Sequence, residues 1–221
     1  MATNDILGVS FVYIYVAILL FVTEKILNRY PMTGRKILHI MVGNIVFILP
    51  LFQTREIMAF VAAAPFIVLT FLISPHSPIK SLSKVSQAGH GLGLVYYAIS
   101  WTILAYFFFD RLWIVGVGIL AMSYGDGFAS IFGARFGKHT YQVFHDKKSI
   151  EGSTIMFLTT LTLLVINFLF YSRPLTVYII TALFFVSLLA TFVEALTPRG
   201  LDNLTVPLLA SFAYWCIASG I

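Results

Sequence analysis

The sequence predicts an all-α integral membrane protein, and three features lead to this prediction. Hydrophobic residues make up 59% of the 221 residues, charged residues make up 10%, and the mean hydropathy is +0.93. Such values lie far outside the range of soluble proteins. The apolar residues form runs long enough to cross about 30 Å of hydrocarbon. These runs lack the alternation of a barrel strand, and backbone groups in lipid must be paired within the segment, so helices are expected.

Eight apolar runs predict about eight transmembrane helices in a single domain covering residues 1–221. No basic region precedes the first run, so we interpret it as a retained span and not as a cleaved signal peptide. The second run is short and contains Pro50. The single Cys216 excludes an intramolecular disulfide. The predicted spans are 6–23, 37–53, 56–73, 91–109, 112–134, 153–172, 175–196 and 204–220.

The basic residues predict which side of the membrane each loop occupies. Of the fourteen Lys and Arg residues, eleven lie in loops that follow odd-numbered helices and three in the opposite loops. Basic residues concentrate in cytoplasmic loops, so both termini are expected outside and the polar motifs at the cytoplasmic face. This distribution accounts for the net charge of +5 without a nucleic-acid partner. The eleven are Lys25, Arg29, Arg35, Lys36, Lys80, Lys84, Arg135, Lys138, Lys147, Lys148 and Arg199; the three are Arg55, Arg111 and Arg173.

The first polar motif is MTGRKILHIMVGN, residues 32–44. Arg35 and Lys36 lie three or four positions before His39, so these side chains share one end of a helix face. The two basic residues alone would fit a membrane anchor with snorkelling side chains. His39 and Asn44 lie deeper, where a polar group is costly unless it has a partner. The cluster is therefore a candidate functional site.

The second motif is GDGFASIFGARFGKH, residues 125–139, at the end of an apolar run. Asp126, Ser130 and Gly133 are spaced i, i+4 and i+7 and so lie on one helical stripe. Gly133 and Gly137 permit close approach of a phosphate or of a packed helix. The tail lacks the glycine spacing and the final Ser or Thr of a phosphate-binding P-loop. Because an acidic residue near hydrocarbon is a functional candidate by default, Asp126 is the central residue of this motif.

Two further motifs follow, KKSIEGS at 147–153 and FVEALTPRGLDNLTVP at 192–207. The paired lysines suit phosphate, Ser149 is placed to cap a helix, and Glu151 falls in its first turn. A helix N-terminus also offers free N–H groups to an anion. Glu194 is embedded in an apolar helix end, and Asp202 stands where it could be either a helix cap or a ligand.

Together these motifs place basic side chains, carboxylates and glycines on one side of the membrane. That set suits a nucleotide phosphate chain and a divalent cation, and carboxylate oxygens favour Mg²⁺. Phosphoryl transfer requires mainly positioning and neutralisation of charge. The second substrate would then be a membrane lipid whose head group lies at the interface.

In the order RKILH, GDGFASIFGARFGKH, KKSIEGS and VEALTPRGLDNLTVP, the motifs resemble the CTP-dependent polyprenol (dolichol) kinase family, which includes phytol kinase and CTP-dependent diacylglycerol kinase. The resemblance covers residues 35–207. It implies a minimal catalytic core that uses CTP and a divalent metal to phosphorylate a membrane isoprenoid alcohol, of dolichol or polyprenol type or geranylgeraniol or phytol. The expected location is the cell membrane of a prokaryote or the endoplasmic reticulum of a eukaryote, and glycine spacings of the GxxxG kind would also suit a homodimer.

The motifs and the resemblance together predict a role for each site residue. The expected catalytic residues are His39, Asp126, Lys148 and Glu151. The expected ligands of CTP and its phosphates are Arg35, Lys36, Ser130, Gly133, Gly137, Lys138, Lys148, Ser149 and Gly152. The expected metal ligands are Asp126, Glu194 and Asp202, with Asn44 and Asn203 as supporting polar residues.

Two alternatives remain for the function. A phosphatidate cytidylyltransferase also uses CTP and a similar glycine-rich run, but its Asp-Arg-x-Asp element is replaced here by GLDNLTVP. A small transporter could bind ions through intramembrane carboxylates, yet the sequence shows no internal repeat and its polar groups gather at one face. A CDP-alcohol phosphotransferase is rejected, because Ser130 stands where its motif requires Arg.

Overall fold

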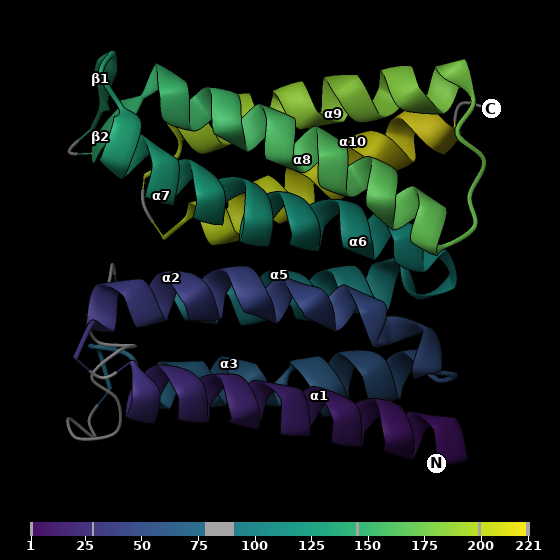
Figure 1. Cartoon of the computed structure of the whole chain (residues 1–221). Helices are drawn as coiled ribbons and strands as arrows, with labels where there is room; N and C mark the ends of the chain where they lie inside the picture. The colour runs from purple at the N-terminus through teal and green to yellow at the C-terminus, as the bar shows by residue number, and fades with distance from the viewer. Residues whose placement is uncertain (1, 28, 78–90, 145, 199, 220–221) are drawn as a thin grey trace.

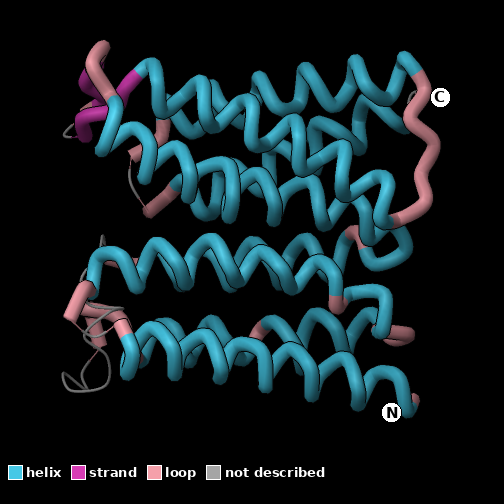
Figure 2. The backbone as a smooth tube through the Cα atoms, viewed as in Figure 1, coloured by secondary structure: helices cyan, strands magenta, loops and turns pink. Residues whose placement is uncertain are grey.

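The structure is a computed structural model that describes all residues except 1, 28, 78–90, 145, 199 and 220–221. Lys80, Lys84 and Arg199, used above to predict sidedness, lie outside the described residues. Helix occupies most of each described predicted span, and helices dominate the chain (Figure 2). The prediction of an all-α membrane protein is therefore confirmed.

The described residues of the first half of the chain form four α-helices interrupted by short irregular turns. The helices are α1 (Thr3–Phe21), α2 (Pro31–Val42), α3 (Pro65–Leu72) and α5 (Gly93–Phe107). α1 continues as a π-helical turn, Val22–Ile26, and α2 as 3₁₀ turns, Gly43–Phe47 and Leu49–Leu51. A π-helical segment, Ile57–Ala63, precedes α3.

The second half begins with a 3₁₀ turn, Phe109–Arg111, and α6 (Leu112–Leu120), which passes through a π-helical turn, Ala121–Asp126, into α7 (Gly127–Phe136). A hairpin of β1 (Thr140–Val143) and β2 (Asp146–Ser149) follows. The chain then forms α8 (Ile150–Phe170), α9 (Val177–Leu196) and α10 (Asp202–Ser219).

Five helical segments within the described residues are long and apolar enough to cross a membrane: Thr3–Ile26, Pro31–Leu51, Phe109–Phe136, Ile150–Phe170 and Val177–Leu196. Ile57–Leu72 and Gly93–Phe107 are apolar but shorter. The number of eight spans thus stays a prediction. The N- and C-termini lie at the same end of the molecule, opposite the hairpin (Figure 1).

The helices form two groups that meet at α2 and α5 (Figure 1). α1 and α3 lie on one side, and α6 to α10 lie on the other, where α8 and α10 pack against both α6 and α9. Consecutive residues from Ile114 to Met122 are buried, so α6 is the central helix of the second group. Large apolar side chains such as Phe11, Phe185 and Phe192 are exposed on the outer helices, as expected for surfaces that face lipid.

The hairpin is a feature that the sequence analysis did not predict. β1 and β2 pair antiparallel, from Thr140 opposite Ser149 to Val143 opposite Asp146. Its strands are short and largely polar, without the apolar alternation that indicates a strand in sequence. The hairpin leads directly into α8 at the end of the molecule where the polar motifs lie.

Candidate active site

A cavity of about 540 Å³ opens beside the hairpin, at the end of the molecule opposite the termini. This volume is typical of a small-molecule site. Its walls come from α2, α5, α7, the hairpin, α8, the end of α9 and the start of α10. It brings together most of the predicted site residues: Arg35, Lys36, His39, Asp126, Ser130, Gly133, Gly137, Lys148, Ser149, Gly152, Glu194, Asp202 and Asn203.

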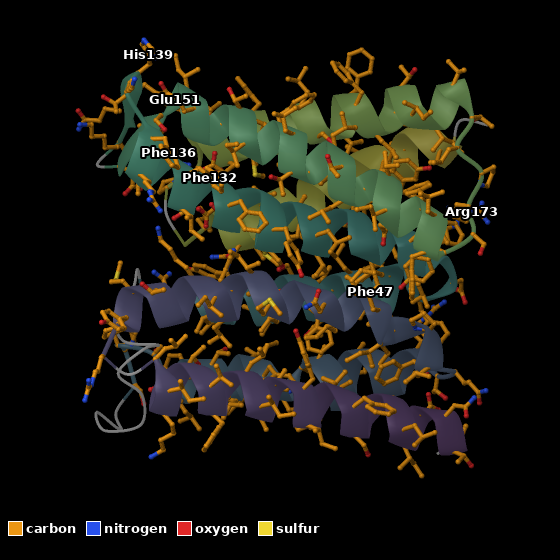
Figure 3. All side chains as sticks on the ribbon, viewed as in Figure 1. Phe47, Phe132, Phe136, His139, Glu151 and Arg173 are labelled. Carbon is orange, nitrogen blue, oxygen red and sulfur yellow. The ribbon has the colours of Figure 1, made fainter. Side chains whose placement is uncertain are left out.

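Three predicted residues do not line this cavity: Asn44, Lys138 and Glu151. Lys138 is exposed. Glu151 accepts hydrogen bonds from the backbone N–H of His139 and lies 2.8 Å from its Nδ1, so this pair joins the hairpin to α8 (Figure 3).

Asn44, in the 3₁₀ turn after α2, instead connects α1 with the π-helical turn Ala121–Asp126. Its Nδ2 donates to the Tyr15 hydroxyl over 3.0 Å, and its Oδ1 accepts from the Tyr124 hydroxyl. A half-buried amide that both donates and accepts in this way has its hydrogen-bonding groups paired within the protein. Asn44 therefore supports the helices behind the site and does not face the cavity.

Asp126 and His39 face each other across the contact between the π-helical turn and α2. His39 Nε2 lies 3.3 Å from Asp126 Oδ2 and 3.1 Å from the carbonyl oxygen of Met122. Because a carbonyl can only accept, Nε2 carries a proton, and in a neutral imidazole Nδ1 is then the basic nitrogen. The contact fixes His39 as a side chain that can take up a proton beside a carboxylate.

The two glycines around Asp126 allow this contact. A Cβ at Gly127 would lie 2.3 Å from Cγ1 of Ile40 on α2, and a Cβ at Gly125 would lie 2.4 Å from Oγ1 of Thr160 on α8. Both distances are too short for carbon atoms in contact. The GDG sequence thus lets α2 and α8 pack closely on either side of the turn that carries Asp126.

Lys148 and Glu194 form a buried ion pair at the cavity wall, with Nζ and Oε1 2.7 Å apart and both side chains less than a tenth exposed. Lys148 Nζ also donates to the backbone carbonyls of Glu194 and Thr197 at the end of α9. An ammonium group has three protons to donate, and cations stabilise a helix C-terminus. Lys148 therefore holds β2 against the end of α9 as well as placing positive charge beside the cavity.

Ser149 caps the start of α8, as the sequence predicts. Ser149 Oγ accepts a hydrogen bond from the N–H of Gly152 over 3.1 Å, and Glu151 lies in the first turn. α7 packs against this turn, and a Cβ at Gly133 would lie 3.4 Å from Cα of Gly152. The glycines here serve helix packing and at the same time leave backbone exposed to the cavity.

Asp202 and Asn203 begin α10 on the far wall of the cavity. Asp202 Oδ1 accepts from the N–H groups of Gly200 and Asn203, at 3.0 and 2.9 Å, and so holds the turn instead of capping the second or third residue of the helix. Asn203 Nδ2 donates to the carbonyl of Gly200. Its Oδ1 is buried and accepts no hydrogen bond from any described residue.

The charges around the cavity are mixed, with four basic side chains and three carboxylates. Lys36 Nζ donates to the carbonyl of Ser130 over 3.1 Å, which ties α2 to α7. The basic set is Arg35, Lys36, Lys147 and Lys148, and the acidic set is Asp126, Glu194 and Asp202. Sequence analysis assigned no role to Gly93, Leu94 or Gly200, which also line the cavity; the paired glycines of GLGL at 91–94 were the available signal.

The sequence is similar to that of proteins named as phytol kinases. A phytol kinase of Synechocystis sp. is 33% identical over 202 residues, which cover 87% of this chain and 84% of that protein. The chain belongs to the phytol kinase family. A probable chloroplastic phytol kinase of Triticum aestivum is 32% identical, over 84% of this chain and 67% of that protein. The chloroplastic phytol kinase 1 of Arabidopsis thaliana is also 32% identical, over 81% of this chain and 64% of that protein. No family model and no solved structure matches the chain.

Membership of the phytol kinase family agrees with the resemblance found in the motifs. The four motifs fall on different helices, and the structure collects residues of all four around one cavity. The residues that carry the family resemblance therefore line this cavity, and we treat it as the candidate active site.

Proposed function

We propose that the protein is a kinase that transfers the γ-phosphoryl group of CTP to the hydroxyl of a membrane isoprenoid alcohol, of the phytol, geranylgeraniol or polyprenol type. The observation that carries the proposal is the cavity of mixed charge at the end of apolar helices, in a chain 33% identical to a phytol kinase. The relatives are named as kinases, which favours phosphoryl transfer over transfer of a cytidylyl group. CTP as the donor follows from the motif resemblance.

The phosphate chain would lie between the basic residues and the start of α8. Arg35, Lys36 and Lys147 supply positive charge from two sides of the cavity, whereas the charge of Lys148 is neutralised by its pair with Glu194. The first N–H groups of α8 face an anion favourably because a helix N-terminus carries partial positive charge. Ser130 and Gly137 add a hydroxyl and backbone to the same wall.

Asp126, Asp202 and Asn203 would hold the divalent cation. No group of three His, Cys, Asp or Glu side chains that could hold a metal ion occurs among the described residues. Mg²⁺ does not need one, since it is usually bound by one or two carboxylates together with substrate phosphates and waters. The buried Oδ1 of Asn203 is an oxygen acceptor still without a donor, which fits such a set. Glu194 is the weakest member, because Lys148 already neutralises it.

His39 is the residue that would receive the hydroxyl proton. As the alcohol oxygen forms its bond to the γ-phosphorus, the bond from that phosphorus to the β–γ bridging oxygen breaks and CDP leaves. The proton passes to Nδ1 of His39, whose Nε2–H is held by Asp126 and Met122. Bound Mg²⁺ supplies the positive charge that neutralises the phosphate oxygens during this transfer.

The reaction would take place at the cytoplasmic face. The cavity lies at the end of the molecule where the basic loops gather, and the positive-inside rule predicts that basic loops face the cytoplasm. The alcohol would enter from the surrounding bilayer, and CTP from water.

The direct test incubates purified protein with γ-labelled CTP, γ-labelled ATP and a panel of phytol, geranylgeraniol, polyprenol and diacylglycerol. The expected result is labelled isoprenoid phosphate and CDP. Release of pyrophosphate with a cytidylylated lipid would replace the proposal by a cytidylyltransferase. Solute flux through proteoliposomes with no consumption of CTP would replace it by a transporter.

A further inference from the structure

A second, apolar crevice adjoins the polar cavity. It lies among α1, α2, α3 and α5, the helices of the first half of the chain (Figure 1). Two residues, His39 and Leu94, line both the crevice and the cavity. The crevice walls are otherwise formed by Val16, Leu20, Leu38, Val42, Ile45, Phe66, Leu69, Thr70, Ile73, Tyr97, Ala98 and Trp101. The apolar crevice therefore ends at the histidine that faces Asp126.

The hydroxyl groups on the crevice wall already have partners within the protein. Thr70 Oγ1 donates to the carbonyl of Phe66 over 2.6 Å, and the Tyr97 hydroxyl lies 2.8 Å from Ser123 Oγ. Neither hydroxyl demands a polar ligand. Apart from Nε1 of Trp101, which is buried without a hydrogen-bond partner among the described residues, the wall suits a hydrocarbon chain. Leu69 lines the crevice and is also 39% exposed on the outer surface of the helices.

The crevice is small, with a volume of about 50 Å³. One water molecule needs roughly 10–15 Å³ of such space, so only a few carbon-sized groups fit. A chain of twenty carbons would not fit, and most of it must lie outside the crevice, along the helices in the bilayer.

We propose that this crevice binds the first carbons of the acceptor alcohol, with the hydroxyl at His39, and that the rest of the tail stays in the bilayer. The inference rests on the proposed function and adds the path and the part of the substrate that is recognised. The occupant follows from the two residues, His39 and Leu94, that line both spaces. In the proposed path, hydrocarbon enters at Leu69 and its hydroxyl end meets the phosphate cavity at His39. The enzyme would then recognise the carbons next to the hydroxyl of the alcohol, and its kcat/KM would not depend on the length of the tail.

The test fills the crevice from α3. Thr70→Phe places a ring in the crevice. The matched control Val68→Phe places the same ring on the same helix, at a residue that is 62% exposed and does not line the crevice. We measure kcat/KM for phytol, farnesol and a long polyprenol, and the Kd for CTP by titration calorimetry.

Thr70→Phe is expected to lower kcat/KM for every alcohol by roughly tenfold or more, the effect of changing the fit of a hydrophobic pocket, with the Kd for CTP unchanged. Val68→Phe is expected to behave like the wild type. Equal kinetics for Thr70→Phe and Val68→Phe would overturn the crevice proposal and would show that any lipid bound there is structural.

The wild type supplies a second measurement that needs no variant. Its kcat/KM is expected to be similar for farnesol, phytol and the polyprenol, and to fall for alcohols altered at the carbons next to the hydroxyl. A steady rise in kcat/KM with each added isoprene unit would place the tail inside the protein and overturn the proposal, even if Thr70→Phe failed to fold. If the wild type phosphorylates no alcohol, the proposed function itself is wrong and this inference falls with it.

Discussion

The two ends of the molecule each hold an aspartate, Asp5 buried and Asp126 half-buried, and the two aspartates have different surroundings. At the end that carries the termini, Asp5 accepts hydrogen bonds from the backbone N–H groups of Gln53 and Thr54 and from the Thr54 hydroxyl. At the hairpin end, Asp126 lines a cavity, beside His39 and among basic side chains. Asp5 closes a turn between two helices, whereas Asp126 faces space that a ligand can fill. Burial alone does not distinguish a structural carboxylate from a functional one; the partners do.

The largest expected effect comes from breaking the buried ion pair at the hairpin end. Lys148→Met leaves Glu194 buried without its partner, which should lower the free energy of unfolding by about 3–5 kcal/mol, measured by denaturation in detergent. The double variant Lys148→Met with Glu194→Leu should recover much of that loss, because it removes both charges. An unchanged stability of the single variant would contradict the structural role of the pair.

Asp126→Asn tests the functional side of the comparison directly. Removing the charge should lower kcat for CTP-dependent phosphorylation by roughly 10²–10³-fold, the usual cost of losing a group that stabilises transition-state charge. Asp5→Asn is the matched control: it should destabilise the protein and leave the kcat of the folded fraction near that of the wild type. Comparable kcat losses in both variants would show that Asp126 is no more functional than Asp5.

Gly127→Ala tests whether close packing of α2 positions the site. The added Cβ would meet Ile40, and the strain should cost about 1–3 kcal/mol and move His39 away from Asp126. We expect a lower kcat with little change in the Kd for CTP. Adding Ile40→Ala should restore part of the kcat, since it removes the atoms that clash. If the kcat is not restored, the clash with Ile40 is not the cause of the loss in Gly127→Ala.

The smallest effect is expected at the start of α8. Ser149→Ala removes the cap on Gly152 and should lower stability by about 1 kcal/mol, read from the denaturation midpoint. If the exposed N–H groups also bind phosphate, the Kd for CTP should rise modestly. Ser149→Asp, which keeps a capping oxygen but adds negative charge, should retain stability and weaken CTP binding; tighter binding would argue against phosphate at this turn.

Much of the site could be predicted from single residues. Asp126, Glu194 and His39 stand in apolar runs where a polar side chain is costly, so their presence alone indicates a role. Ser149 and Glu151 follow the pattern of a helix start, and the cap is present. Membership of the kinase family also followed from the order of the motifs.

Other features depended on distances that the sequence does not contain. The motifs and the family resemblance predicted Glu151 and Lys138 as site residues, yet neither lines the cavity. The hairpin carries no periodic signal, and the pairing of Lys148 with Glu194 joins residues 46 positions apart.

The sequence by itself determined that the chain is a helical membrane protein with its polar chemistry gathered at one end, because hydropathy and charge act locally along the chain. Only the tertiary structure decided which polar residues share a cavity, which neutralise one another and where an apolar crevice meets His39. These outcomes depend on how closely α2, α7 and α8 approach, and that approach is set by contacts such as those at Gly125 and Gly127 between segments far apart in sequence.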